Sequence, residues 1–154
     1  MRSAWLTLPL LLTTFAFADH WQSRGAILNP TEARKLAQPC SRVGPQQVSG
    51  QWMPIAAQIE QLENSLPAHH RLLQTRVRDD RFNVGLEVYA RQYAGFVAGG
   101  RRIIYVNLFF RPNFESDAWW RTQAAVVCDG GPRNWGVEFE VDRARFVNPA
   151  FNGR

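Results

Sequence analysis

The stretch LEVYARQYAGFVAGGRRIIYVNLFF, residues 86–110, decides the fold. Residues 86–97 and 102–110 are rich in β-branched and aromatic residues, and Gly99-Gly100 lies between them. Two adjacent glycines suit a two-residue hairpin turn, because both positions tolerate positive φ. Both faces of this hairpin mix polar and apolar residues, so the pattern does not assign one of them to the core. The pairs expected to face each other are Phe96 with Ile103, Ala94 with Tyr105, Gln92 with Asn107, Tyr93 with Val106 and Arg91 with Leu108.

Further strands are expected on the C-terminal side of the hairpin. Residues 135–141 alternate between apolar side chains and Gly136, Glu138 and Glu140. This period of two predicts a strand with one buried face and one face in water. Residues 122–128 are expected to form another strand, and residues 145–147 to begin a last short one.

Two helices are expected before the hairpin. Asn29 is a suitable N-cap, Pro30 suits the first helical position, and Glu32 lies where it can reach back to the cap. Pro39 should end this helix.

The second helix carries a clearer pattern. Pro54 suits its first turn, and an apolar stripe at helical spacing follows. Pro67 is expected to end the helix. The stripe consists of Ile55, Ile59, Leu62 and Leu66.

The order of these elements predicts an α+β domain. N-terminal helices precede an antiparallel β-meander of four to five strands with one helix packed on it, in a cystatin-like arrangement. Residues 19–50 form an N-terminal arm with a short helix and a loop. Residues 51–154 form the α+β core, and both segments belong to one domain.

The first 18 residues are predicted to be a signal peptide. Arg2 supplies the positive charge, residues 4–17 are uncharged and mostly apolar, and Ala16-Phe17-Ala18 fits the cleavage rule, with cleavage before Asp19. The apolar run is too short to span a membrane. We therefore expect a protein that is not membrane-spanning and that is periplasmic or secreted.

Cys40 and Cys128 are the only cysteines, and outside the cytoplasm such a pair tends to oxidise. A disulfide is therefore expected between them. A catalytic thiol is the alternative, but neither cysteine lies at the start of a helix near a histidine, where nucleophilic cysteines usually lie.

The sequence contains no recognisable catalytic set, metal motif or cofactor-binding loop. The three histidines include the adjacent pair His69-His70, whose spacing does not suit metal binding, and we expect both to lie on the surface. The carboxylates of Asp129, Glu138 and Glu140 are the candidates for catalysis, because a hydrolase needs a carboxyl group of raised pKa in a cleft.

Arginine and tryptophan provide the candidate binding surface. The chain has 18 basic and 13 acidic residues, and Lys35 is the only lysine. Arginine and tryptophan are favoured at binding hot spots. An acidic protein or an anionic envelope polymer is the expected partner, whereas export and the interleaved acids argue against nucleic acid. The surface is expected to comprise Trp119, Trp120, Arg101, Arg102 and Arg91.

Several short motifs in the C-terminal two thirds resemble a family of small exported bacterial proteins. The resemblance implies an exported, single-domain α+β protein and transfers no active site. The motifs are RQYAG (91–95), GRRIIYVN (100–107), VCDGG (127–131), WGVEF (135–139) and FNG (151–153).

Three functions remain open at this stage. The first is a non-catalytic binding protein of the bacterial envelope, in its sharper form an inhibitor or immunity-type protein. The second is a small cell-envelope hydrolase that uses carboxylates. The third is a structural or assembly module, which an exposed Trp119-Trp120 patch would favour.

Overall fold

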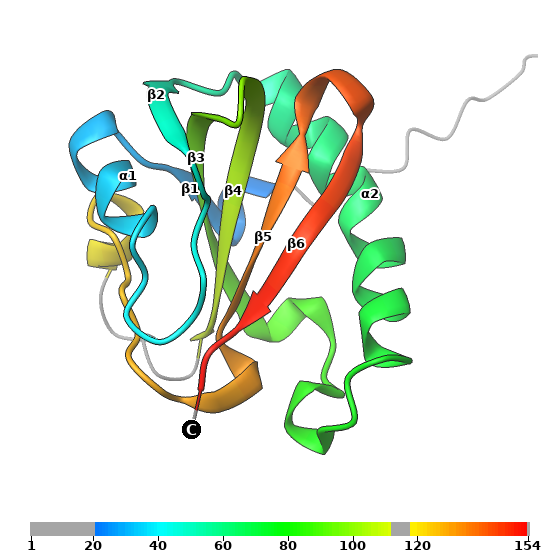
Figure 1. Cartoon of the computed structure of the whole chain (residues 1–154). Helices are drawn as coiled ribbons and strands as arrows, with labels where there is room; N and C mark the ends of the chain where they lie inside the picture. The colour runs from blue at the N-terminus through cyan, green and yellow to red at the C-terminus, as the bar shows by residue number, and fades with distance from the viewer. Residues whose placement is uncertain (1–20, 112–117, 154) are drawn as a thin grey trace, which may run out of the picture.

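The computed structural model describes residues 21–111 and 118–153, and it is an α+β fold built on one mixed sheet (Figure 1). Six strands are found in the described part of the chain. The strands are β1 (Gly25–Ile27), β2 (Val48–Trp52), β3 (Tyr89–Ala98), β4 (Arg101–Phe110), β5 (Trp135–Glu140) and β6 (Arg145–Phe151), and the helices are α1 (Pro30–Leu36) and α2 (Ala56–Gln74).

The hairpin of β3 and β4 has the predicted register at every pair. Gly99 and Gly100 both have positive φ, as the two-residue turn requires. β3 begins at Tyr89, because residues Leu86–Val88 form a short 3-10 helix before it. The hairpin is therefore the part of the fold that local sequence specifies most completely.

The sheet is mixed, whereas the sequence predicted an antiparallel meander. β1 pairs parallel with β3, and β2 pairs antiparallel with the other end of the same edge of β3. β4, β5 and β6 follow on the opposite edge as antiparallel neighbours. β1 and β2 are short and irregular in pattern, and their positions depend on tertiary contacts with β3. The cystatin-like detail is not confirmed.

Both faces of the sheet are covered. On one face α2 packs against β3, β4 and β5, and its buried side chains meet a large apolar cluster. The side chains of this cluster are Ile59, Leu62, Leu66, Leu73, Phe82, Tyr89, Tyr93, Ile104, Val106, Leu108, Trp135, Val137 and Phe139.

The opposite face is covered by α1 and by residues 118–128. α1 contributes Ala33 and Leu36 against Phe96 and Tyr105, and Trp120 packs against Phe109. Since this face is covered too, all six residues of β5 are buried. The prediction that Glu138 and Glu140 lie in water is therefore wrong.

The start of α1 is confirmed in detail. Asn29 caps it, with its side-chain oxygen accepting from the backbone N–H of Glu32 at 3.1 Å. The Glu32 carboxylate does not return to the cap. It accepts instead from Lys35 at 2.8 Å and from the backbone N–H of Ala124 at 2.8 Å.

The second helix does not end at Pro67. α2 continues to Gln74 with Pro67 inside it. Pro67 is exposed, and the buried stripe runs on through His70 and Leu73, so tertiary packing outweighs the lost backbone hydrogen bond. Ile55, expected to begin the stripe, is the N-cap and is 61% exposed.

Residues 122–128 do not form the predicted strand. The backbone of this segment forms hydrogen bonds with the side chains of Gln92 and Asn107, not with the backbone of a neighbouring strand. The oxygen of Gln92 accepts from the N–H of Ala125 at 2.8 Å, and the amide of Asn107 donates to the carbonyl of Ala125 at 3.0 Å. The predicted polar pair is thus real, and its two members also bond each other at 3.0 Å.

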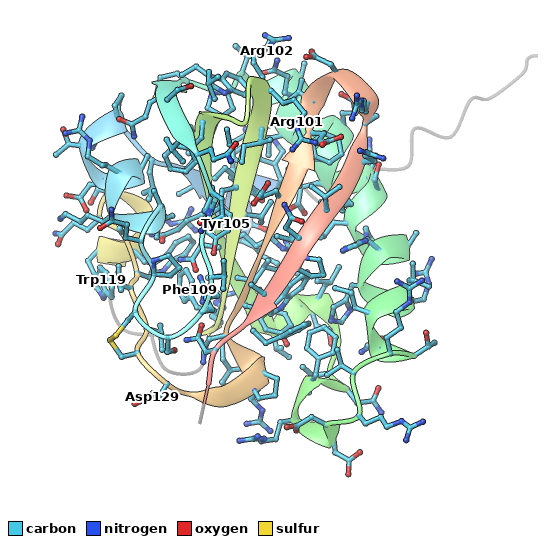
Figure 2. All side chains as sticks on the ribbon, in the orientation of Figure 1. Arg101, Arg102, Tyr105, Phe109, Trp119 and Asp129 are labelled. Atoms are coloured by element: carbon cyan, nitrogen blue, oxygen red, sulfur yellow. A yellow bond between two sulfur atoms is a disulfide. The ribbon has the colours of Figure 1, made fainter. Side chains whose placement is uncertain are left out.

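The predicted disulfide is confirmed between Cys40 and Cys128. It joins the loop after α1 to the end of the 118–128 segment, so it holds two parts of one covering layer together (Figure 2). The predicted signal peptide, residues 1–18, lies outside the described residues. Among the described helices, none has both the length and the apolar character needed to cross a bilayer.

Replacing both cysteines, as Cys40→Ser with Cys128→Ser, should lower the free energy of unfolding by up to about 4.6 kcal/mol, because a loop of 88 residues is no longer closed in the unfolded chain. Urea unfolding of the oxidised protein and the double variant measures the difference. Reductant should shift the wild type toward the double variant and leave the variant unchanged. A response of both proteins to reductant would contradict this account.

Gln92→Leu should lower the free energy of unfolding by about 3 kcal/mol, because the N–H of Ala125 and two carbonyls of the segment lose their partner inside the protein. Gln61→Leu on the exposed face of α2 is the matched control and should change stability by no more than about 0.5 kcal/mol. Equal effects of the two substitutions in urea unfolding would show that Gln92 does not hold the segment.

Candidate functional site

The structure does not bring the five predicted surface residues together. Arg91 and Trp120 are buried and Trp119 is half-buried, so these residues offer little surface to a partner. Arg101 and Arg102 are exposed at the end of the β3–β4 hairpin, far from Trp119 (Figure 2). Only these two of the predicted residues form a common surface.

Arg91 has a structural role under α2. Its guanidinium pairs with Glu63 at 3.2 Å and donates to the carbonyl of Leu86 at 3.1 Å. The hydroxyl of Tyr93 donates to the same carboxylate at 2.7 Å. Burial holds the pKa of Tyr93 well above its usual value. These contacts fix α2 to the sheet and engage both terminal nitrogens of the Arg91 guanidinium.

Trp120 belongs to the apolar layer over Phe109, with ring centroids 5.8 Å apart. The guanidinium of Arg121 lies 4.4 Å from the centroid of its ring and donates to the carbonyls of Gln22 and Ser23. Trp119 packs against the same cluster. The two tryptophans therefore anchor residues 118–121 to β1.

Three arginines meet around one buried carboxylate at the hairpin end. Glu140 has a side chain only 3% exposed, and Arg101, Arg143 and Arg145 all pair with it. The hydrogen bond from Arg145, 2.6 Å long, lowers the pKa of Glu140, and the nearby positive charges act in the same direction. The three arginine side chains remain about half exposed.

Arg102 extends this positive surface. It pairs with the exposed Asp142 at 2.8 Å and lies 5.6 Å from the ring centroid of Trp52. We call the set Arg101, Arg102, Arg143 and Arg145 the arginine end. Within it, four guanidinium groups share two carboxylates, so positive charge is in excess.

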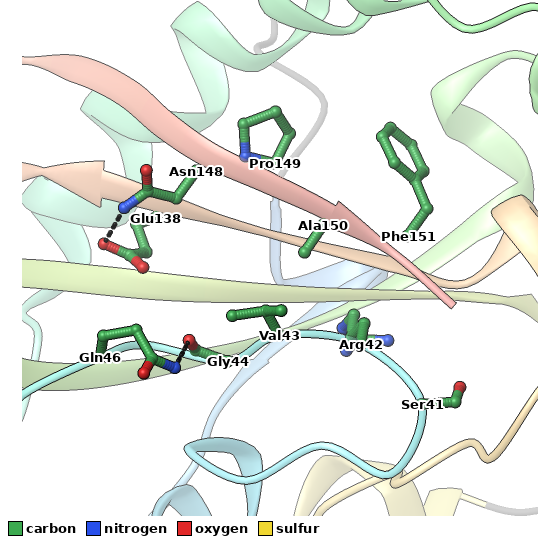
Figure 3. Close-up of a pocket in the computed structure, with 10 residues that line it drawn as sticks. All are labelled: Ser41, Arg42, Val43, Gly44, Gln46, Glu138, Asn148, Pro149, Ala150 and Phe151. Atoms are coloured by element: carbon green, nitrogen blue, oxygen red, sulfur yellow. Dashed lines mark hydrogen bonds between the residues drawn. The ribbon is translucent and has the colours of Figure 1, made fainter. Parts of the chain in front are cut away.

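The three candidate carboxylates have different environments. Asp129 is exposed in the turn after Cys128, and Glu140 is held ionised by arginines. Glu138 lines a pocket of about 630 Å³ between residues 41–46 and the strands β5 and β6 (Figure 3). These carboxylates therefore do not form a pair across one cleft.

The pKa of Glu138 is raised, whereas that of Glu140 is lowered. Burial disfavours the charge of Glu138, while a hydrogen bond from Asn148 at 3.1 Å and the charge of Arg101 act in the opposite direction. The residue is 6% exposed. A carboxyl group in this state can exchange a proton nearer neutral pH than an ordinary glutamate.

Arg42 and Asn148 line the same pocket, and no sequence pattern selects either residue as a candidate. Arg42 lies in a loop without regular pattern, and Asn148 has φ of +52° at an irregular point of the β5–β6 pairing. Their positions follow from long-range contacts. The positive φ of Asn148 is a conformation that asparagine tolerates better than most residues.

His70 is buried, so the prediction of a surface position is wrong for it. Its ring stacks on Trp135 with centroids 5.8 Å apart and also contacts Phe82 and Tyr89. Burial, with the charge of Arg91, lowers the pKa of His70 to about 4. His69 is half-buried and stacks on Phe146.

Residues 21–111 and 118–153 contain no group of three His, Cys, Asp or Glu side chains that could hold a metal ion. Comparison of the chain with protein-family models, curated proteins and solved structures finds no match. Its function must therefore be inferred from the geometry of its own residues.

Acidification should destabilise the protein through His70. The pKa of this residue is about 4 in the folded state and about 6.5 when unfolded, so below pH 6.5 only the unfolded state gains the proton. The cost grows until pH 4 and reaches about 3 kcal/mol. Urea unfolding between pH 7 and pH 4 measures it.

His70→Phe keeps an aromatic ring against Trp135 and removes the titration. The variant should therefore lose clearly less stability than the wild type between pH 7 and pH 4, with the remaining slope set by His69, Glu140 and Glu32, whose pKa values are lowered. Parallel pH profiles of the two proteins would contradict the assignment to His70.

Proposed function

We propose that this protein is an exported, non-catalytic binding protein of the bacterial envelope, and that its arginine end contacts an acidic protein. The observation that carries the proposal is that three half-exposed arginines surround one carboxylate, the buried side chain of Glu140. Arg102, on the same end, adds a fourth guanidinium. A fixed excess of positive charge favours and steers an acidic partner.

Apolar residues on the same end support a protein as the partner. Trp52 lies beside Arg102, and Met53 and Ile55, 49% and 61% exposed, follow it in the loop to α2. The start of α2 and the β3–β4 and β5–β6 turns lie at this end of the molecule (Figure 1). Tryptophan, methionine and arginine are enriched at protein interfaces.

The fixed geometry of the arginine end suits an inhibitor or immunity-type protein. Glu140 holds three guanidinium groups in place before a partner arrives. Such groups lose little further freedom on binding, which favours a tight complex. An acidic enzyme of the envelope is the partner that this form of the proposal requires.

A cell-envelope hydrolase is the second candidate function. It is favoured by one observation, the raised pKa of Glu138 in the pocket. Glu140, the nearest candidate for a second carboxylate, has a lowered pKa and is occupied by arginines. Hydrolysis would therefore depend on Glu138 alone, and loss of a measured hydrolytic activity in Glu138→Gln would favour this candidate over the first.

The binding proposal is tested by Arg101→Gln with Arg102→Gln. Arg71→Gln with Arg76→Gln, in the last turn of α2 and just after it, is the matched control with the same change in net charge. Each immobilised protein is exposed to an envelope extract, and retained proteins are purified and titrated by calorimetry. We expect one acidic protein that binds the wild type and the control with 1:1 stoichiometry and binds the Arg101/Arg102 variant at least tenfold more weakly.

The salt dependence gives a second readout of the same complex. Affinity for the wild type should fall as salt rises, because the contact is electrostatic. Equal binding by the two double variants, or affinity independent of salt, would contradict a role for the arginine end.

A further inference from the structure

The pocket beside Glu138 lies on the part of the sheet face that α1 leaves open. α1 and residues 118–128 cover this face over β3 and β4 with apolar side chains. Over β5 and β6 the cover is the loop of residues 41–46, and the pocket of about 630 Å³ lies between that loop and the strands (Figure 3). The residues that the argument uses are Arg42, Val43, Glu138, Asn148, Pro149 and Ala150.

Arg42 is a half-buried cation without an acidic partner among the described residues. Its guanidinium donates to the hydroxyl of Tyr105 at 2.9 Å and to the side-chain oxygens of Asn107 and Asn152. All three acceptors are uncharged, and no described carboxylate lies within 4 Å of the guanidinium. The group is therefore held in one position while its charge lacks a counterion. A partly desolvated charge of this kind favours an anionic ligand group.

Glu138 supplies the opposite charge. Its one hydrogen bond within the described structure comes from Asn148. The nearby arginines, Arg101 and Arg145, pair with Glu140 instead. Glu138 lies opposite Tyr105, and Gly136 lies opposite Asn107, so the two charged sites are about two strand residues, or roughly 7 Å, apart. Figure 3 shows Arg42 and Glu138 on either side of Val43 and Ala150.

The surface between the two charges is apolar. Val43 is 67% exposed on the loop side, Ala150 points toward it from β6, and Pro149 also lines the pocket (Figure 3). A ligand between Arg42 and Glu138 would thus place a small apolar body on these residues and a charge at each end. The same contacts would satisfy both charges, for which residues 21–111 and 118–153 provide no oppositely charged side chain in an ion pair.

We propose that this pocket binds a zwitterion of the amino-acid class, a free amino acid or short peptide, with its carboxylate at Arg42 and its ammonium group at Glu138. This site is separate from the arginine end, and the proposal goes beyond the binding of an acidic protein.

The probes are alanine, Ala-Ala and Ala-Ala-Ala, with N-acetylalanine and alaninamide as derivatives that keep only one of the two charges. Calorimetry or NMR titration of the whole protein measures each affinity. At least one zwitterion should bind tenfold or more tightly than both derivatives. Whether alanine or one of the peptides binds most tightly shows whether the pocket accepts a free amino acid or a short peptide. The best zwitterion should lose tenfold or more in affinity for Glu138→Gln.

Arg42→Gln removes three internal hydrogen bonds and can prevent folding, so Glu138→Gln carries the test. Glu60→Gln, which removes an exposed carboxylate of α2 outside the pocket, is the control and should bind the zwitterion as the wild type does. Three results would each overturn the proposal. No zwitterion binds at about 10 mM, or N-acetylalanine binds as tightly as the best zwitterion, or Glu138→Gln binds that zwitterion as tightly as the wild type does.

Discussion

The fold depends on burying the β3–β4 hairpin on both of its faces at once. α2 covers one face with an apolar cluster, and α1 with residues 118–128 covers the other. A hairpin of two ten-residue strands buried in this way must also satisfy the polar groups that it carries inside. Gln92 and Asn107 meet this requirement by binding the backbone of the covering segment, and the disulfide ties that segment to the loop after α1.

The same constraint determines where the charges lie. Since β5 is buried on both faces, Glu138 and Glu140 cannot simply face water. Glu140 is stabilised by three arginines and stays ionised, whereas Glu138 has one amide partner and a raised pKa. One strand therefore presents two different chemical groups, a charge cluster at the molecular end and a carboxyl group in a pocket.

Local sequence predicted the parts of this structure that depend on neighbouring residues. Gly99-Gly100 determined the hairpin register, and Asn29-Pro30 determined the start of α1. The prediction that α2 ends at Pro67 is wrong, because the buried side chains of His70 and Leu73 stabilise the helix beyond that residue. β1, β2 and the 122–128 segment depend on contacts with distant parts of β3, so no local period identifies them. For the site, arginine excess pointed to Arg101 and Arg102, but the burial of Arg91 and Trp120 and the position of Arg42 follow only from the tertiary fold.

Amide hydrogen exchange tests the two-sided burial of the sheet most directly. The account predicts that the N–H groups of Ala94, Val106 and Val137 exchange only by global unfolding, and that Ala125 joins them although it lies in no strand, because Gln92 holds its N–H. Fast exchange of Ala125 beside a protected hairpin would show that the second face is only loosely covered. It would contradict the fixed layer on which the pocket and its charges depend.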